Sequence, residues 1–295
     1  MLRTSLRYFM AVARLGSIRA ASGQLNVAQS AVSRQVQALE HQLGTVLLDR
    51  LTNGVVLTQA GRILYEFGRK VEFETDELHS DLGSLQGLLR GHVRIATIES
   101  MVPYVLPRAI GRSRESYPGV TFAVEATASE RIANLVLEGS SDIGIGLSAR
   151  VSADFHVVSS TRESLMAVTS ASHPLAQQEQ VSLQELAQWP MALAPHPSAS
   201  RVIFEEACRA ANIKVTPALE TNSVELMQRM ATLGLGVALL LRHTIAGSVQ
   251  DGQLTGLGLD RQLFAGTIDV FTFKDRTLPI AVKQFLSILL EEIGT

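Results

Sequence analysis

Three helical segments in close succession, followed by a hairpin signal, occupy the first 58 residues and constrain the fold of this chain more than any other feature. Apolar residues at helical spacing predict helices over 5–15, 17–25 and 29–43. Asn53-Gly54 then separates two short apolar runs, and both residues tolerate the positive φ of a tight hairpin turn. A helix-turn-helix followed by a hairpin wing is typical of DNA-binding domains.

The third helix is predicted to have a buried stripe and a polar face. The stripe has the spacing i, i+4, i+7, i+11 and consists of Val32, Val36, Leu39 and Leu43. The opposite face is polar or basic and holds Gln29, Ser30, Ser33, Arg34 and Gln37. An ordinary solvated face, which is the alternative, normally mixes glutamate and lysine, so this composition favours contact with base edges and phosphates in a major groove. Arg50 and Asn53 of the hairpin are further candidate DNA contacts.

The charge of the chain is unevenly divided. Residues 1–62 carry seven arginines against Glu40 and Asp49, although the whole chain has a formal net charge of −2. The rest of the chain is therefore acidic. This asymmetry is consistent with nucleic acid bound at the N-terminal end.

A long helix is predicted from Thr58 to about Leu89. Two lines of residues seven apart run along it, namely Leu64, Val71, Leu78 and Leu85, with Gly68, Thr75, Leu82 and Leu89. Charged side chains fill most positions between them, so the helix has little to bury except against a partner. The pattern favours a short coiled coil between two copies, and packing of the helix on its own domain is the alternative.

Strand and helix patterns alternate from Gly91 onward. Strands are predicted over 92–98, 120–124 and 142–146 with helices between them, and the same rhythm recurs after Glu163. Such alternation is typical of a parallel sheet covered by helices. The sequence therefore predicts two α/β lobes after the N-terminal domain.

Composition and missing motifs argue against other classes of protein. Hydrophobic residues make up 46% of the 295 residues, which predicts packed cores, and the single cysteine, Cys208, is expected in one of them. No apolar run resembles a signal peptide or a membrane span, so we expect a cytoplasmic protein without membrane contact. Nucleophile, zinc-protease, dinucleotide and phosphate-loop motifs are absent, and we expect no enzyme, no cofactor and no metal site. A solute receptor alone would need an export signal and would leave residues 1–89 without a role.

Several motifs stand at fixed spacing along the whole chain. The most specific are Gly16-Ser17-Ile18-Arg19-Ala20-Ala21, Gln29-Ser30-Ala31-Val32-Ser33-Arg34-Gln35-Val36, Leu57-Thr58-Gln59-Ala60-Gly61 and Gly234-Leu235-Gly236-Val237-Ala238. With these motifs the chain resembles the LysR-type transcriptional regulator family. Ala28 and Ser30 stand where that family often has Ser and Pro. Because alanine cannot cap a helix through its side chain, a shifted start of the third helix stays open.

The resemblance implies a multidomain chain: a winged helix-turn-helix DNA-binding domain over 1–58, a dimerising linker helix over 59–89, and a periplasmic-binding-protein-like α/β effector domain. Its first lobe would comprise 90–161 with 267–295, and its second lobe 162–266. A small organic effector would bind between the lobes, and the residues expected there are Ser100, Met101, Thr127, Ser129, Pro197, Ser198 and Ser200. Glu99 at the same place opposes an anionic effector.

The family also implies the partners of the chain. Dimers would assemble into a homotetramer on double-stranded promoter DNA, and RNA polymerase would be a further partner. A DNA-binding regulator that lacks effector control is the alternative.

Overall fold

The structure is a computed structural model that describes residues 4–51, 54–85, 89–149, 152–259, 263–274 and 276–294. The chain forms two compact units, Met1–Leu85 and Gln86–Thr295, and each is described by itself. None of the helices in the described ranges is long and apolar enough to cross a lipid bilayer.

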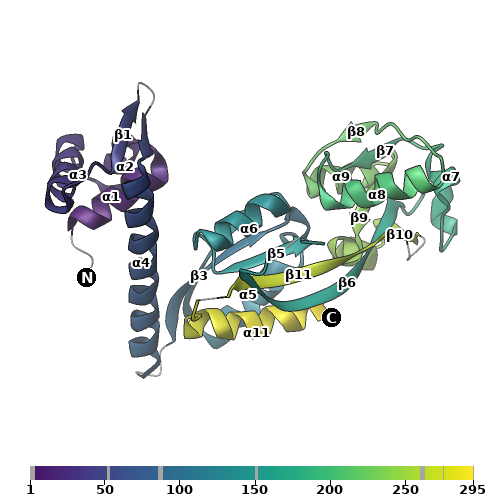
Figure 1. The fold of residues 1–295 in the computed structure, drawn as a ribbon. Coiled ribbons are helices and arrows are strands. Elements are labelled where there is room, and N and C mark those ends of the chain that lie inside the picture. Colours follow the sequence, from purple (N-terminus) through teal and green to yellow (C-terminus); the bar gives the residue numbers. More distant parts are fainter. Residues whose placement is uncertain are drawn as a thin grey trace. The chain divides into compact units, whose positions relative to one another are not determined.

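The N-terminal unit combines helices with a two-stranded hairpin at one end (Figure 1). Its elements are α1 (Thr4–Leu15), α2 (Ile18–Leu25), α3 (Gln29–Leu43), β1 (Leu48–Leu51), β2 (Gly54–Leu57) and α4 (Gln59–Leu85). Ser17 caps α2 by accepting a hydrogen bond from the N–H of Ala20, and α3 ends at Gly44, which has a left-handed φ of 65°. The three predicted helices and the two strands of the hairpin are confirmed. Asn53, in the predicted turn, lies outside the described residues.

The core of this unit is centred on α1. Phe9 and Val12 of α1 are fully buried and belong to one cluster with Val32 and Val36 of α3. Leu43 departs from the predicted stripe, because its side chain is 47% exposed. It is the last residue of α3, and the buried part of the stripe ends one turn earlier, at Leu39.

The first turns of α4 pack on their own domain. Gly68 is buried so close to Met10 of α1 that a Cβ on Gly68 would collide with the methionine sulfur, and Leu64 packs against the same core. The predicted coiled-coil seam is wrong at these two positions, since α1 already covers them. The seam's last member, Leu89, packs against the core of the second unit instead. The side chains of Leu82 and Leu85 lie outside the described ones.

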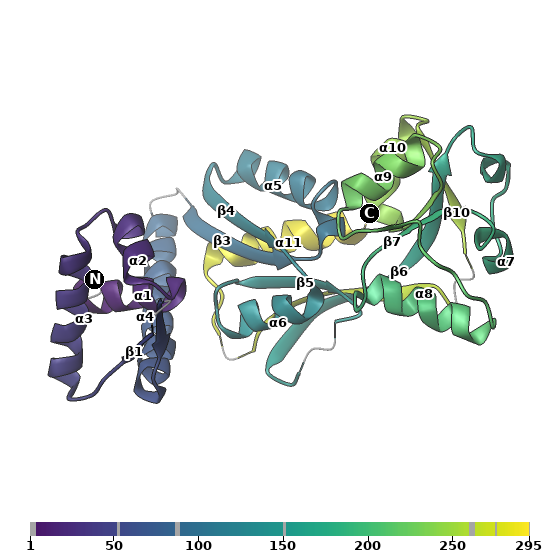
Figure 2. The same ribbon diagram turned by 90° about the horizontal axis from the view of Figure 1, so that it is seen from above.

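The second unit is an α/β structure with two lobes on one sheet (Figure 2). Lobe 1 contains β3 (Arg90–Thr97), η1 (Glu99–Met101), α5 (Val105–Ser116), β4 (Gly119–Ala126), α6 (Ser129–Leu137), β5 (Ile143–Leu147) and α11 (Ile280–Gly294). Lobe 2 contains η2 (Pro174–Gln177), α7 (Leu183–Leu186), β7 (Met191–Leu193), α8 (Ala199–Ala210), β8 (Leu219–Glu220), α9 (Val224–Thr232), β9 (Val237–Leu241), η3 (Arg242–Ile245), α10 (Ala246–Gln250) and β10 (Leu254–Gly258). The long strands β6 (Phe155–Ser170) and β11 (Ala265–Phe273) lie between them.

The order of strands explains how the lobes are joined. The path is β4-β3-β5-β11-β6-β9-β7-β8, and β10 pairs with β6. β3 is parallel to β4 and β5 in lobe 1, and β7 is parallel to β8 and β9 in lobe 2. β6 pairs with β11 as far as Ser164 and with β9 from Leu165, so a single strand crosses from one lobe to the other.

Parts of this sheet were not predicted as strands, namely β8, β10, β11 and the first part of β6. Residues 155–164 of β6 were not predicted as a strand, because their run of serine, threonine and arginine lacks an apolar alternation; pairing with β11 makes them one. β10 was also missed, because Gly256 and Gly258 interrupt its apolar residues. Gly256 has a packing role, since a Cβ there would lie 2.7 Å from Cδ1 of Ile245.

Candidate functional site

One surface of α3 carries the predicted DNA contacts of that helix. The side chains of Gln29, Ser30, Arg34 and Gln37 are exposed, and that of Ser33 is half-buried. Arg34 donates from Nε to the carbonyl of Ser30 at 3.3 Å, and Arg50 of β1 donates from Nη2 to Oγ of Ser33 at 3.5 Å. The hairpin therefore adds a second guanidinium to the polar face of α3.

The hairpin is held against α3 by the one acidic residue of that helix. Oε1 of Glu40 accepts the N–H groups of Leu47 and Leu48 at 2.8 and 3.3 Å. On the other strand, the N–H of Val55 donates to the carbonyl of Gly16 at 2.9 Å. Because Glu40 is turned to the hairpin, it adds no negative charge to the face that carries Arg34.

Helix α3 begins at Gln29, without a shift. Ala28 occupies the N-cap with no side-chain hydrogen bond, and its carbonyl accepts the N–H groups of Ala31 and Val32. The first two N–H groups of a helix have no intrahelical partner. The start of α3 therefore offers those of Gln29 and Ser30 to an external acceptor such as a phosphate oxygen.

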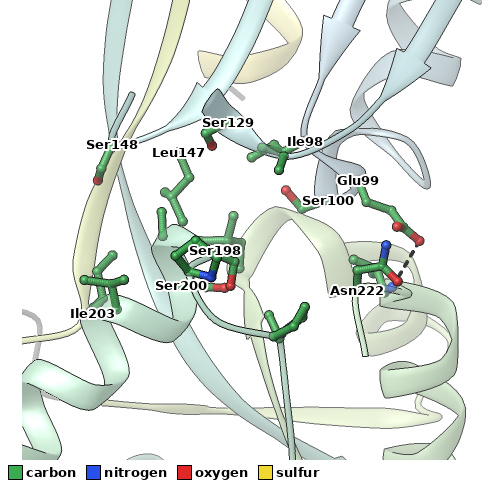
Figure 3. A pocket seen from close by; sticks show the side chains of 18 of the residues that line it. Ile98, Glu99, Ser100, Ser129, Leu147, Ser148, Ser198, Ser200, Ile203 and Asn222 are labelled. Carbon is green, nitrogen blue, oxygen red and sulfur yellow. Dashed lines mark hydrogen bonds between the residues drawn. The ribbon is translucent and has the colours of Figure 1, made fainter. Parts of the chain in front are cut away.

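A cavity of about 990 Å³ lies between the two lobes of the second unit (Figure 3). It is bordered by the segments that follow β3, β4 and β5 in lobe 1 and by the starts of α8 and α9 in lobe 2. Carboxyl ends of parallel strands meet at such an edge, where α/β proteins bind ligands. Six of the seven residues predicted to bind an effector line this cavity: Ser100, Thr127, Ser129, Pro197, Ser198 and Ser200.

Met101 is the predicted residue that does not line the cavity. Its side chain is 1% exposed and belongs to the main hydrophobic core of the unit. Successive residues of the short helix η1 point in different directions, so Ser100 faces the cavity while Met101 faces the core.

Three hydroxyl groups in the cavity wall are buried without a hydrogen-bond partner. They are Oγ of Ser100 and Ser198 and Oγ1 of Thr244. Thr244 is only 4% exposed, and it comes from η3, a segment that sequence reasoning did not connect with the site. Buried polar groups normally have a partner, so unpaired hydroxyls from three segments indicate a surface built for a polar molecule.

Sequence reasoning also missed Ser148 and Asn222, which line the cavity. Ser148 follows directly after β5. The rule that ligands bind at carboxyl ends of parallel strands would have pointed to it. Ser100 and Thr127, which also follow such strands, were expected from the family resemblance. Asn222 precedes α9 in lobe 2, and no local pattern marks it.

Polar contacts between the lobes adjoin the cavity. Oε1 of Glu99 in lobe 1 accepts the N–H of Val224 at the start of α9, at 3.2 Å. His243 of lobe 2 contacts the carbonyl of Ser100 through Nε2 at 3.2 Å and Oε2 of Glu163 through Nδ1 at 3.1 Å. Burial by itself raises the pKa of Glu163. The hydrogen bond and charge of His243, the N–H of Ser164 and the charge of Arg242 together lower that pKa below the usual value.

The candidate site offers no ligand set for a metal ion. In the described part of the chain, histidine, cysteine, aspartate and glutamate side chains form no group of three that could hold one. The two candidate surfaces are a polar, basic helix face in one unit and a cavity lined by hydroxyls in the other.

Comparison with known proteins identifies the class to which these two surfaces belong. Residues 4–62 match the model of the bacterial regulatory helix-turn-helix protein, lysR family, and residues 86–294 match the LysR substrate binding domain. The protein is a DNA-binding transcriptional regulator with an effector-binding domain, not an enzyme. The chain belongs to the LysR family.

Relatives extend along almost the whole chain. The transcriptional activator CmpR of Synechocystis is 26% identical over 281 residues, which cover 95% of this chain and 92% of that protein. The RuBisCO operon transcriptional regulator of Allochromatium vinosum is 29% identical, with coverage of 92% and 86%.

Solved structures of full-length proteins share the fold. A full-length OxyR variant from Pseudomonas aeruginosa has a TM-score of 0.73 at 20% identity and covers 99% of this chain and 94% of its own. CbnR complexed with its target DNA has a TM-score of 0.66 at 20% identity, with coverage of 99% and 100%.

Proposed function

We propose that this regulator reads an operator through the polar face of α3 and responds to a small organic molecule bound between the lobes of its effector domain. Binding of that molecule would shift the protein between two DNA-bound arrangements. A ligand can do so only through different affinities for the two states. RNA polymerase is a further partner in this proposal.

The DNA contacts in this proposal are those of α3 and the hairpin. Gln29, Ser30, Ser33, Arg34 and Gln37 would face the major groove. Arg50 and Asn53 would contact the flanking DNA. Amide, hydroxyl and guanidinium groups are the side chains that read base edges and phosphates, and the bond from Arg50 to Ser33 supports a common surface.

The assembly in this proposal is a homotetramer built from dimers. Dimers would form through α4, which exposes Ile63, Phe67 and Leu78. Two copies of α3 would then read paired half-sites of a roughly symmetric operator.

The three unpaired hydroxyls of Ser100, Ser198 and Thr244 carry the proposal that the cavity holds the effector. Together with Thr127, Ser129, Pro197 and Ser200 they suit a polar organic molecule held by a few hydrogen bonds. The volume of about 990 Å³ lies at the upper end of the usual range for small-molecule sites.

Ser100→Trp tests this site, because an indole at this position would project into the cavity beside the unpaired hydroxyls and obstruct a ligand that binds them. A thermal-shift screen of metabolites with three to eight carbons should give stabilising compounds for the wild-type protein and none for the variant. Gel shifts with the promoter beside the gene should show unchanged DNA affinity. Ser287→Trp is the matched control, since Ser287 is exposed on α11 and does not line the cavity.

Two outcomes would contradict the proposal. Compounds that stabilise Ser100→Trp as strongly as the wild type would bind elsewhere. A screen without any stabilising compound would favour a regulator that lacks effector control.

A further inference from the structure

The cavity between the lobes has an unusual balance of charge. Three of its lining residues are acidic, namely Glu99, Glu130 and Glu206, and no lysine or arginine occurs among the lining residues that the structure describes. Arg201 follows the lining residue Ser200, but it pairs with Glu205 and Glu220. His196 is the lining residue in the described wall that can become a cation, and it lies 3.9 Å from Glu205. The rest of that wall offers carboxylates and hydroxyls to a ligand.

Glu99 is the carboxylate best placed to meet a ligand. Its Oε1 is engaged by the N–H of Val224, and among the described residues no cation pairs with this side chain. Figure 3 shows Glu99 and Asn222 facing one another across the lobes, with Ser100 beside them. The positive end of α9 meets only Oε1 of this partly buried carboxylate, so Oε2 can take a positive charge that a ligand supplies.

Two helix starts at the cavity, those of α6 and α9, already meet carboxylates. Glu130 lies in the first turn of α6 and already meets the positive end of that helix. The start of α9 is occupied, because Val224 donates to Glu99 and Leu226 donates to Ser223. At the start of α8, the unpaired hydroxyl of Ser198 can bind an uncharged oxygen equally well.

We propose that the effector carries a protonated amine that pairs with Glu99, while its hydroxyl or carbonyl groups bind the unpaired hydroxyls of Ser100, Ser198 and Thr244. This inference rests on the proposed function, which makes the cavity the effector site. Because Glu99 also bridges to α9, the amine would bind where the two lobes meet. Organic acids would be disfavoured by the same carboxylates.

Three probes with the same four-carbon chain test the charge preference: 4-aminobutan-1-ol, butane-1,4-diol and 4-hydroxybutyrate. Their dissociation constants for the full-length protein are measured by ligand-observed NMR at pH 7.5, up to 50 mM. We expect the amine to bind at least about tenfold more tightly than the acid, the size of one charge-assisted hydrogen bond. Glu99→Gln keeps an oxygen for Val224 and should abolish this preference.

Glu115→Gln is the matched control, since Glu115 is exposed on α5 and outside the cavity. It should leave the preference unchanged. Tighter binding of 4-hydroxybutyrate than of the amine, a preference that survives in Glu99→Gln, or no binding of 4-aminobutan-1-ol at 50 mM would each overturn the inference.

Ser100→Trp shows whether only the charge preference is wrong or whether the cavity is not the effector site at all. If the acid binds the wild type and loses its affinity in Ser100→Trp, the cavity is the ligand site and only the charge assignment is wrong. Binding of the probes that is equal in both proteins would mean that the cavity is not their site, and both proposals would fail.

Discussion

Arg34 combines an exposed position with a fixed orientation. Its Nε donates to the carbonyl of Ser30, one turn earlier on α3, which directs the guanidinium toward the start of the helix. In a helix-turn-helix motif the N-terminal part of the second helix of the motif, here α3, reaches the base edges. An arginine placed there can bind a guanine with two hydrogen bonds.

We therefore expect Arg34→Ala to weaken operator binding by about 1–3 kcal/mol and to relax the preference at one base pair. Arg14→Ala is the control for charge alone, because Arg14 pairs with Glu72 at the far end of α1. The affinities of both protein variants for the operator and for operators with single-base changes are measured at one salt concentration. They distinguish a base contact of Arg34 from an effect of charge alone. Equal losses for both variants would mean that Arg34 contributes charge but no base contact.

At the scale of the element, α4 has two faces with different roles. At about 100° per residue, Ile63, Phe67 and Leu78 fall within about 60° of one another around the helix, whereas Gly68 lies beyond them, toward α1. The predicted lines of residues seven apart include Leu78 of the exposed face together with Leu64 and Gly68 of the face toward α1. A sequence pattern cannot separate these faces, because it carries no information about where α1 packs. The exposed stripe is therefore the surface available to a second copy.

Phe67→Glu with Leu78→Glu should convert the protein to a smaller species, because two charges would be buried at the proposed coiled coil. Light scattering coupled to gel filtration measures the mass. Leu51→Glu, at an exposed leucine of the hairpin, is the control and should keep the parent mass. A parent mass in the double variant would show that α4 does not mediate assembly.

The extent of prediction from sequence also depends on the element. Helix α3 was predicted with the bounds that the structure has, Gln29 to Leu43, because its apolar period is clear. The strand over residues 155–164 was missed, because it depends on pairing with β11. Thr244 was missed as a cavity residue, because the packing of η3 brings it there. Long-range partners of this kind leave no periodic signal in the local sequence.

At the scale of the whole effector domain, one short chain of contacts joins the cavity to the strand that crosses between the lobes. Ser100 lines the cavity, its carbonyl contacts His243, and His243 contacts Glu163 on β6. Both ring nitrogens of His243 face oxygen acceptors, so both bonds form together only when the ring is doubly protonated. The contact between the lobes therefore depends on charge.

This chain of contacts predicts a pH dependence of stability. The pKa of Glu163 is lower in the folded protein than the usual value of about 4.3, so ionised Glu163 stabilises the fold above that value. The contribution is lost as the pH falls through the lowered pKa. Glu163→Gln should reduce the free energy of unfolding by about 1–3 kcal/mol at pH 7, as for a hydrogen bond to a charged group, and by progressively less below about pH 5. Urea denaturation of both proteins from pH 7 to about pH 3 measures the difference. A difference that stays constant over this range would show that the charge of Glu163 contributes nothing.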